Sequence, residues 1–186
     1  MKKKENIYNV PNLLTLTRVL IFFVIVYMIV KDYELWDIII VFVIGMLTDF
    51  FDGQIARYFH VETEFGAKFD MIADRILMIG TVIALIISFS LKGILSGWYS
   101  FQIILVLSRE IISMPIVLWI IFSRKFVIPK VKFIGKLTTF MQAIAFPLIL
   151  LNIIYSHIQF SIYFAVITSI IGIMSAFTFI KDIRRV

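Results

Sequence analysis

Four aspartates lie close together in the stretch DFFDGQIARYFHVETEFGAKFDMIAD, residues 49–74. Asp49 and Asp52 are three residues apart, and Asp70 and Asp74 are four apart, so each pair shares one face if its segment is helical. A short loop between the two segments would bring the two faces together. Clustered carboxylates hold divalent cations, and oxygen ligands suit Mg²⁺, Mn²⁺ or Ca²⁺ better than zinc. The spacing therefore predicts a cation site.

A simpler interpretation of the aspartates is also open. They are then charges at loop ends that reach water, or partners of three basic residues in the same stretch, Arg57, Lys68 and Arg75. Two glycines favour the cation site, because one directly follows the second aspartate and the other comes four residues before the third: Gly53 and Gly66. A glycine beside a carboxylate lets backbone or ligand approach closely.

The elements that position these carboxylates belong to a membrane protein. Of the 186 residues, 61% are hydrophobic and 16% are charged, and the mean hydropathy is +1.02, far too apolar for an ordinary soluble domain. A membrane-spanning helix needs about 20 apolar residues, so this length accommodates about six spans joined by short loops. The sequence contains no cysteine, which excludes disulfides and thiolate metal sites.

Six apolar runs of nearly span length cover the chain, at residues 12–30, 36–58, 67–91, 98–123, 133–155 and 159–180. No loop between them is long enough for a second domain. We therefore expect an all-α fold, an integral membrane bundle of six transmembrane helices that forms a single domain over residues 1–186. The aspartates fall at the end of the second helix and the start of the third.

Most Lys and Arg residues lie on one side of this six-span arrangement. That side carries Lys2, Lys3, Lys4, Lys68, Arg124, Lys125, Lys130, Lys132, Lys181, Arg184 and Arg185. The opposite side has only Lys31 and Lys92. By the positive-inside rule, both termini and the aspartates face the cytoplasm. If the source is prokaryotic, the membrane is the cell membrane or inner membrane. The net charge of +6 then reflects topology and contact with anionic membrane lipids, and no nucleic-acid-binding signature competes with that interpretation.

The aspartate stretch is similar, in every fixed position, to the signature of the CDP-alcohol phosphotransferase family, the class I CDP-alcohol phosphatidyltransferases. The matching residues are Asp49, Asp52, Gly53, Ala56, Arg57, Gly66, Asp70 and Asp74. Upstream, the segment from Asn9 to Arg18 resembles the opening of the phosphatidylglycerophosphate synthase and cardiolipin synthase branches. Together with the six predicted spans, the resemblance covers nearly the whole chain.

The resemblance implies a transferase that moves a phosphatidyl group from a CDP-linked lipid to an alcohol, releases CMP and uses two divalent cations, Mg²⁺ or Mn²⁺. Two such cations would clamp the pyrophosphate and neutralise developing charge. The metal ligands it implies are Asp49, Asp52, Asp70 and Asp74, with Asp74 also the general base on the acceptor hydroxyl. The CDP contacts it implies are Thr15, Asp49, Gly53, Arg57 and Gly66.

Three basic residues within or at the edge of predicted spans are candidates for binding the acceptor: Arg18, Arg109 and Lys136. An ionisable residue inside a membrane is a functional candidate by default. The alternative for each is a side chain that snorkels to the interface or forms an internal pair, such as Arg109 with its neighbour Glu110 or with an aspartate.

Two further segments bear on the acceptor. The triplet Ser-Arg-Glu at 108–110 and the block at 135–142 resemble segments of phosphatidylglycerophosphate synthases, although the second lysine of their block is Thr138 here. The segment 129–136 also resembles eukaryotic-type cardiolipin synthases, whose acceptor is phosphatidylglycerol. We expect glycerol 3-phosphate as the acceptor, with phosphatidylglycerol, an inositol phosphate or another polar alcohol as alternatives.

A function of a different class is a divalent-cation transporter that uses the aspartates as an intramembrane relay. That function requires carboxylates near the bilayer midplane, whereas the predicted helices place them toward one end. If the chain associates, a two-fold homodimer is the expected arrangement.

Overall fold

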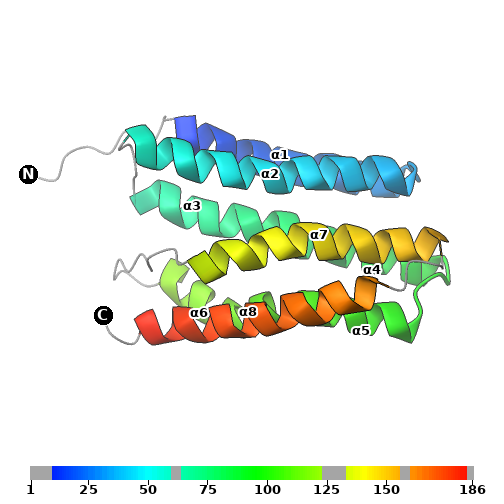
Figure 1. Ribbon diagram of the computed structural model, residues 1–186. Helices are drawn as coiled ribbons and strands as arrows, with labels where there is room; N and C mark the ends of the chain where they lie inside the picture. The colour runs from blue at the N-terminus through cyan, green and yellow to red at the C-terminus, as the bar shows by residue number, and fades with distance from the viewer. Residues whose placement is uncertain (1–9, 60–63, 123–132, 156–159, 184–186) are drawn as a thin grey trace, which may run out of the picture. The chain divides into compact units, whose positions relative to one another are not determined.

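The computed structural model describes the backbone over residues 10–59, 64–122, 133–155 and 160–183. Within these ranges, the side chains of residues 10–12, 14, 49–59, 64, 65, 67, 121 and 183 are not described. Every regular element in the described ranges is helical, which confirms the all-α prediction. The elements are α1 (Val10–Val30), α2 (Leu35–Phe59), α3 (Glu64–Arg75), the π-helical turn η1 (Ile76–Gly80), α4 (Thr81–Leu91), α5 (Gly97–Val106), α6 (Ser108–Phe122), α7 (Phe133–Tyr155) and α8 (Ser161–Ile183) (Figure 1).

Helices long and apolar enough to cross a membrane are present among the described residues. Three satisfy both conditions: Lys68–Leu91, which joins α3, η1 and α4, then Phe133–Tyr155 and Ser161–Asp182. The pair α5 and α6 makes a fourth if it is one bent span, and the apolar stretches Thr15–Val30 and Leu35–Thr48 are shorter. Integration into a membrane agrees with these lengths. The full count of six spans and the cytoplasmic termini stay predictions.

The fourth predicted span is not one continuous helix. α5 ends at Val106 and α6 begins at Ser108, and the two axes differ by 51°. Leu107, between them, has φ −83° and ψ 0°, outside the helical region. A break inside an apolar segment leaves backbone carbonyls in need of donors, and here the Gln142 amide of α7 donates to the Val106 carbonyl at 2.9 Å. The partner comes from another helix, so the local sequence carries no sign of it.

Residue contacts divide the chain into two compact units, Met1–Leu85 and Ile86–Val186, with the division inside α4. The prediction of a single domain over residues 1–186 stays a prediction. In the first unit, α1 packs on α2, α3 and η1 (Figure 1). The core of this unit includes the buried side chains of Ile25, Phe42 and Leu77.

Small residues let the helices of the first unit approach closely. A Cβ on Gly45 of α2 would lie 3.0 Å from both Ile21 of α1 and Leu77 of η1. A Cβ on Gly80, at the end of the π turn, would lie 2.5 Å from Cε2 of Phe22 on α1. The π turn fits closely against α1 because its last residue, Gly80, has no side chain.

In the second unit, α8 packs on α5, α6 and α7, and α7 also packs on α5. Polar clusters cross between the described parts of these helices. Near one end, Ser161 donates to Gln102 Oε1 at 2.7 Å and accepts from Asn152 Nδ2 at 2.9 Å. The other cluster surrounds Arg109 and belongs to the candidate site. Interhelical hydrogen bonds of this kind stabilise membrane bundles, where packing lacks a strong hydrophobic driving force.

The contact between Gly80 and Phe22 predicts the effect of a single methyl group. We expect Gly80→Ala to destabilise the protein by about 1–3 kcal/mol, because the methyl overpacks the interface of η1 with α1. The matched control is Gly97→Ala, because a Cβ on Gly97 meets nothing within 4 Å. Thermal unfolding of the detergent-solubilised protein measures both, and equal unfolding temperatures for the two variants would contradict the prediction.

Candidate functional site

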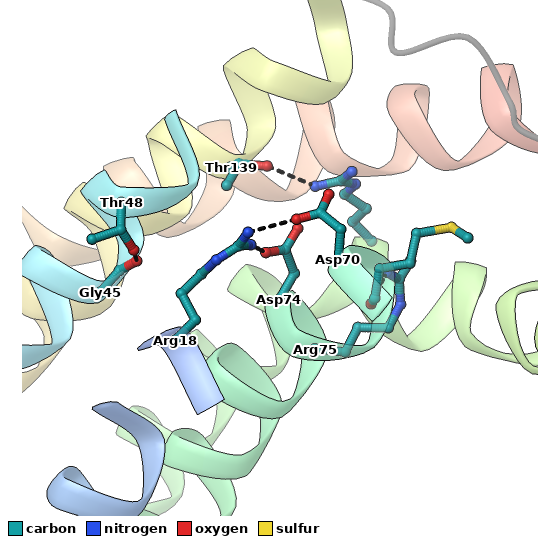
Figure 2. A network of polar contacts seen from close by, with 9 residues as sticks. Arg18, Gly45, Thr48, Asp70, Asp74, Arg75 and Thr139 are labelled. Atoms are coloured by element: carbon teal, nitrogen blue, oxygen red, sulfur yellow. Dashed lines mark hydrogen bonds and ion pairs between the residues drawn. The ribbon is translucent and has the colours of Figure 1, made fainter. Parts of the chain in front are cut away.

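Arg18 of α1 is completely buried, which is unusual for a cation and requires a counter-charge. It has one in α3. One Nη of Arg18 donates to Asp70 Oδ1 at 2.5 Å, and the other donates to Asp74 Oδ1 (Figure 2). The guanidinium thus lies between two carboxylates, and its planar fork suits this arrangement better than an ammonium would.

The two carboxylates lie on one face of α3, as their spacing of four residues predicts, since both reach the same guanidinium. Their outer sides remain open: 42% of the Asp70 side chain and 36% of the Asp74 side chain are exposed. Both hydrogen bonds from Arg18 use Oδ1, and each carboxylate has a second oxygen. The first unit therefore presents two carboxylates that are each bonded to the buried Arg18 and are partly accessible to solvent.

The other half of the predicted cluster lies on α2. This helix runs without interruption through Asp49, Asp52, Gly53 and Arg57, but their side chains lie outside the described residues. Convergence of the two aspartate pairs stays a prediction. Thr48, one residue earlier, donates to the Gly45 carbonyl at 2.7 Å within the same helix (Figure 2).

The described side chains alone do not make a metal centre: among them, no three His, Cys, Asp or Glu residues come together. Asp70 and Asp74 nevertheless fit a divalent cation. They converge on one cationic group, they are partly exposed, and they offer only oxygen, which Mg²⁺ and Mn²⁺ prefer. Two more oxygen donors would have to come from the aspartates of α2.

Two of the predicted CDP contacts lie on the helices that carry Arg18 and this pair. Thr15 is buried on α1, three residues before Arg18 and so on the same face. Gly66 lies in the first turn of α3, four residues before Asp70. The structure thus brings Thr15 and Gly66 to the elements that carry Arg18 and the aspartates, and their contact with CDP stays a prediction.

A second polar cluster lies in the second unit, around Arg109 near the start of α6. Arg109 Nη1 donates to Thr139 Oγ1 of α7 at 3.1 Å, the bond drawn at Thr139 in Figure 2. The same nitrogen lies 3.8 Å from Glu110 Oε1. Gly172 of α8 leaves room for this side chain, since a Cβ there would lie 3.1 Å from Arg109 Cβ. The internal pair with Glu110, weighed above as the alternative for this arginine, is present.

Lys136 is exposed in the first turn of α7. Its neighbour Gly135 lies next to Arg109, because a Cβ at that position would be 3.8 Å from Arg109 Nη2. The structure therefore brings two of the three predicted acceptor-binding residues into one neighbourhood of the second unit. Thr138, which replaces a lysine of the related block, is fully buried and donates to the Ile134 carbonyl at 2.8 Å.

Sequence reasoning missed two of these contacts. It offered Arg57, Lys68 and Arg75 as partners of the aspartates, and among arginines within spans it paired only Arg109 by name, whereas the observed partner is Arg18. It also missed the buried hydrogen bond from Gln142 Nε2 to Glu110 Oε2, at 2.5 Å. The usable signal for both was the presence of a charge inside an apolar run, which must find a partner somewhere in the bundle.

Comparisons with known proteins agree on one family. A family model described as CDP-alcohol phosphatidyltransferase matches residues 8–178. The chain is also similar to CDP-diacylglycerol–glycerol-3-phosphate 3-phosphatidyltransferase from Escherichia coli strain K12, with 31% identity over 140 residues, 74% of each chain. The same identity and coverage are found for the enzyme of that description from Shigella flexneri serotype 5b and from Shigella sonnei.

The pairing of Arg18 predicts a metal-dependent stability. In EDTA, we expect Arg18→Met to lower the free energy of unfolding by about 1–3 kcal/mol. This is less than the loss expected from breaking a fully buried ion pair, because both carboxylates are partly exposed. Mg²⁺ should raise the unfolding temperature of this variant more than that of the wild type, because a divalent cation supplies the positive charge that the variant lacks.

Thermal unfolding with EDTA or Mg²⁺ measures both effects. Arg18→Lys is the matched variant, because it keeps the charge and loses the two-pronged geometry, and it should fall between the other two. Identical unfolding temperatures for Arg18→Met and wild type in EDTA would show that the pair contributes nothing to stability.

Proposed function

Because the chain belongs to the CDP-alcohol phosphatidyltransferase family, we propose that it transfers a phosphatidyl group from CDP-diacylglycerol to glycerol 3-phosphate and releases CMP. Membership confirms the resemblance drawn from the aspartate signature. The chain is thus a membrane-associated phosphatidyltransferase of phospholipid synthesis. The observation that carries the choice of acceptor is the 31% identity, over three quarters of both chains, to enzymes named for glycerol 3-phosphate.

The alternatives are weaker. Phosphatidylglycerol as acceptor is supported only by the resemblance of the eight-residue segment 129–136, and no segment of the sequence supports an inositol phosphate in particular. The family match favours a transferase over the cation transporter. Thr138 in place of the second lysine removes one positive charge from the block at 135–142, which keeps the exposed Lys136, and Arg109 of the 108–110 triplet is a further cation.

The family is generally dependent on divalent cations, and the aspartates have the chemistry to hold them. We propose Asp49, Asp52 and Asp70 as metal ligands, with Asp74 completing the site for two Mg²⁺ or Mn²⁺ ions. When bound, such ions supply electrostatic stabilisation of the pyrophosphate and of the leaving phosphate. Support comes from the convergence of Asp70 and Asp74 on one guanidinium and from their exposed outer sides.

The transfer itself needs one proton acceptor. The acceptor's hydroxyl oxygen attacks the phosphorus that carries the diacylglycerol, the bond from that phosphorus to the CMP oxygen breaks, and the electron pair leaves with CMP. We propose that Asp74 takes the hydroxyl proton. A carboxylate next to cations is a modest base, so positioning and electrostatics supply most of the rate.

The remaining predicted contacts divide between donor and acceptor. We propose that Thr15, Asp49, Gly53, Arg57 and Gly66 contact the CDP group. For the acceptor phosphate, Arg109 and Lys136 have the stronger support, because they lie in one neighbourhood and part of each is exposed. Arg18 was predicted to bind the acceptor as well, but its burial and its two carboxylate partners support a role that acts through Asp70 and Asp74.

The setting proposed for this chemistry is a six-span protein with both termini and the active site on the cytoplasmic side, arranged as a homodimer if it associates. A nucleotide head group arrives from water while its acyl chains stay in the bilayer. The positive-inside distribution of Lys and Arg supports this orientation.

Activity with defined acceptors tests the proposed reaction. Purified protein should release CMP from CDP-diacylglycerol with glycerol 3-phosphate and Mg²⁺ or Mn²⁺, and not with phosphatidylglycerol, inositol phosphate or serine. Asp74→Asn should lower kcat by about a hundredfold or more, because it removes both a metal ligand and the general base. The matched control is Asp37→Asn, an exposed aspartate in the first turn of α2, which should keep full activity.

Turnover with another acceptor would reject glycerol 3-phosphate while keeping the family chemistry. Full activity in EDTA, or in Asp74→Asn, would reject the proposed roles of the aspartates.

The absence of native cysteine makes the orientation directly testable. In spheroplasts, a membrane-impermeant maleimide should label Lys92→Cys at once, because residue 92 is predicted to face away from the cytoplasm. It should label Lys125→Cys only after the membrane is permeabilised. The reverse pattern would invert the proposed topology, and labelling of both positions in intact spheroplasts would reject the six-span count.

A further inference from the structure

Glu110 is a carboxylate in an unfavourable place. It lies in the first turn of α6, just after the break at Leu107, and it is only 8% exposed. A buried carboxylate destabilises a protein unless hydrogen bonds or a cation compensate for lost hydration. The proposed reaction does not use this residue, so its burial needs another explanation.

The side chain of Gln142 fixes Glu110 in position. Gln142 is itself buried on α7, and its Nε2 donates both to Glu110 Oε2 at 2.5 Å and to the Val106 carbonyl at 2.9 Å. One amide group therefore satisfies a carbonyl freed by the helix break and anchors the carboxylate one turn later. Because Gln142 is held by the Val106 carbonyl and in turn holds Glu110, the Glu110 carboxylate has little freedom to move with the Arg109 side chain.

Arg109 is held from two directions by groups of the same unit. Glu110 Oε1 lies 3.8 Å from its Nη1, and Thr139 Oγ1 accepts from that nitrogen at 3.1 Å. Thr139 is oriented in turn, since its hydroxyl donates to the Gly135 carbonyl at 3.2 Å. About a quarter of the arginine side chain is exposed. These two contacts restrain the arginine, and part of its side chain stays accessible.

We propose that Glu110, locked by Gln142, and Thr139 are positioning residues that hold the Arg109 guanidinium ready for the phosphate group of an anionic acceptor. This inference rests on the proposed function. A guanidinium that is already oriented loses less freedom when a phosphate binds, so it binds more tightly than a mobile side chain would. A flexible lysine would lack this preorganisation.

The competing explanation is that the cluster only stabilises the broken helix. The two explanations differ in what they change: a structural cluster affects stability, whereas a positioning cluster also affects the KM for the acceptor and leaves the KM for the donor nearly unchanged. The second unit contains a matched control for a purely structural cluster, the hydrogen bonds that join Ser161 to Gln102 and Asn152.

The experiment compares Glu110→Gln, Thr139→Val and Ser161→Ala in the full-length protein. Glu110→Gln keeps the shape of the side chain and removes the charge opposite Arg109. Thr139→Val is nearly isosteric and removes the second restraint. We expect either of these to raise the KM for glycerol 3-phosphate about ten- to a hundredfold, the range that corresponds to a hydrogen bond with a charged group, and to change the KM for CDP-diacylglycerol less than twofold.

Ser161→Ala should lower the unfolding temperature and leave both KM values unchanged. A second readout needs no turnover: glycerol 3-phosphate should raise the unfolding temperature of the wild type and of Ser161→Ala, and raise that of Glu110→Gln and Thr139→Val much less. Since Thr139→Val alters only a partly exposed hydroxyl, it keeps the inference testable if Glu110→Gln does not fold.

The inference is overturned if both variants keep the wild-type KM for the acceptor, or if the two KM values rise together. Failure of the proposed function looks different, because wild-type protein would then turn over some other acceptor. If that acceptor carries a phosphate, a rise of its KM in the two variants supports the positioning role, and an unchanged KM overturns it. If it carries none, the inference fails together with the proposed acceptor.

Discussion

A charge inside a membrane protein is tolerated only where an opposite charge or a set of hydrogen bonds meets it, and in the first unit this constraint falls on Arg18. The guanidinium is completely buried on α1, and its partners Asp70 and Asp74 are both on α3. The ion pairs therefore fix the rotation of α3 about its own axis. Once that rotation is set, the outer sides of the two carboxylates face outward, and the π turn that follows packs its apolar side chains on α1.

The same constraint shapes the second unit by a different route. The break at Leu107 frees a carbonyl inside an apolar segment, and the carboxylate of Glu110 is buried close by. The side-chain amide of Gln142 donates a hydrogen bond to the Val106 carbonyl and another to the Glu110 carboxylate. A helix break exposed to lipid would be destabilising. Here the chain changes direction at the break, and the first turn of α6, which follows it, carries both Arg109 and the Glu110 carboxylate that restrains it.

Much of this could be predicted from the sequence, and the parts that could not have a common physical cause. Apolar runs place the described helices, apart from the break that divides the fourth run, since the length of an apolar segment depends on local composition. The pairing of Asp70 with Asp74 on one face follows from a spacing of four residues. The partner of these aspartates and the break at Leu107 do not follow. Each depends on a side chain from a distant helix, Arg18 in one case and Gln142 in the other, and no local pattern of residues reports which helices pack together.

The two polar clusters differ in the sign of their charge, and that difference suits the two substrates of a phosphatidyl transfer. One guanidinium facing two carboxylates leaves the first cluster with an excess of negative charge, which attracts a divalent cation and disfavours a bare anion. In the second cluster the charges of Arg109 and Glu110 cancel, and the exposed Lys136 follows Gly135, the residue that lies close to Arg109. Partly buried charges of this kind are screened less by salt than fully exposed ones. A transferase that handles a cation-bound pyrophosphate and a phosphorylated acceptor needs both signs of charge, and each is set here by how many carboxylates an arginine meets.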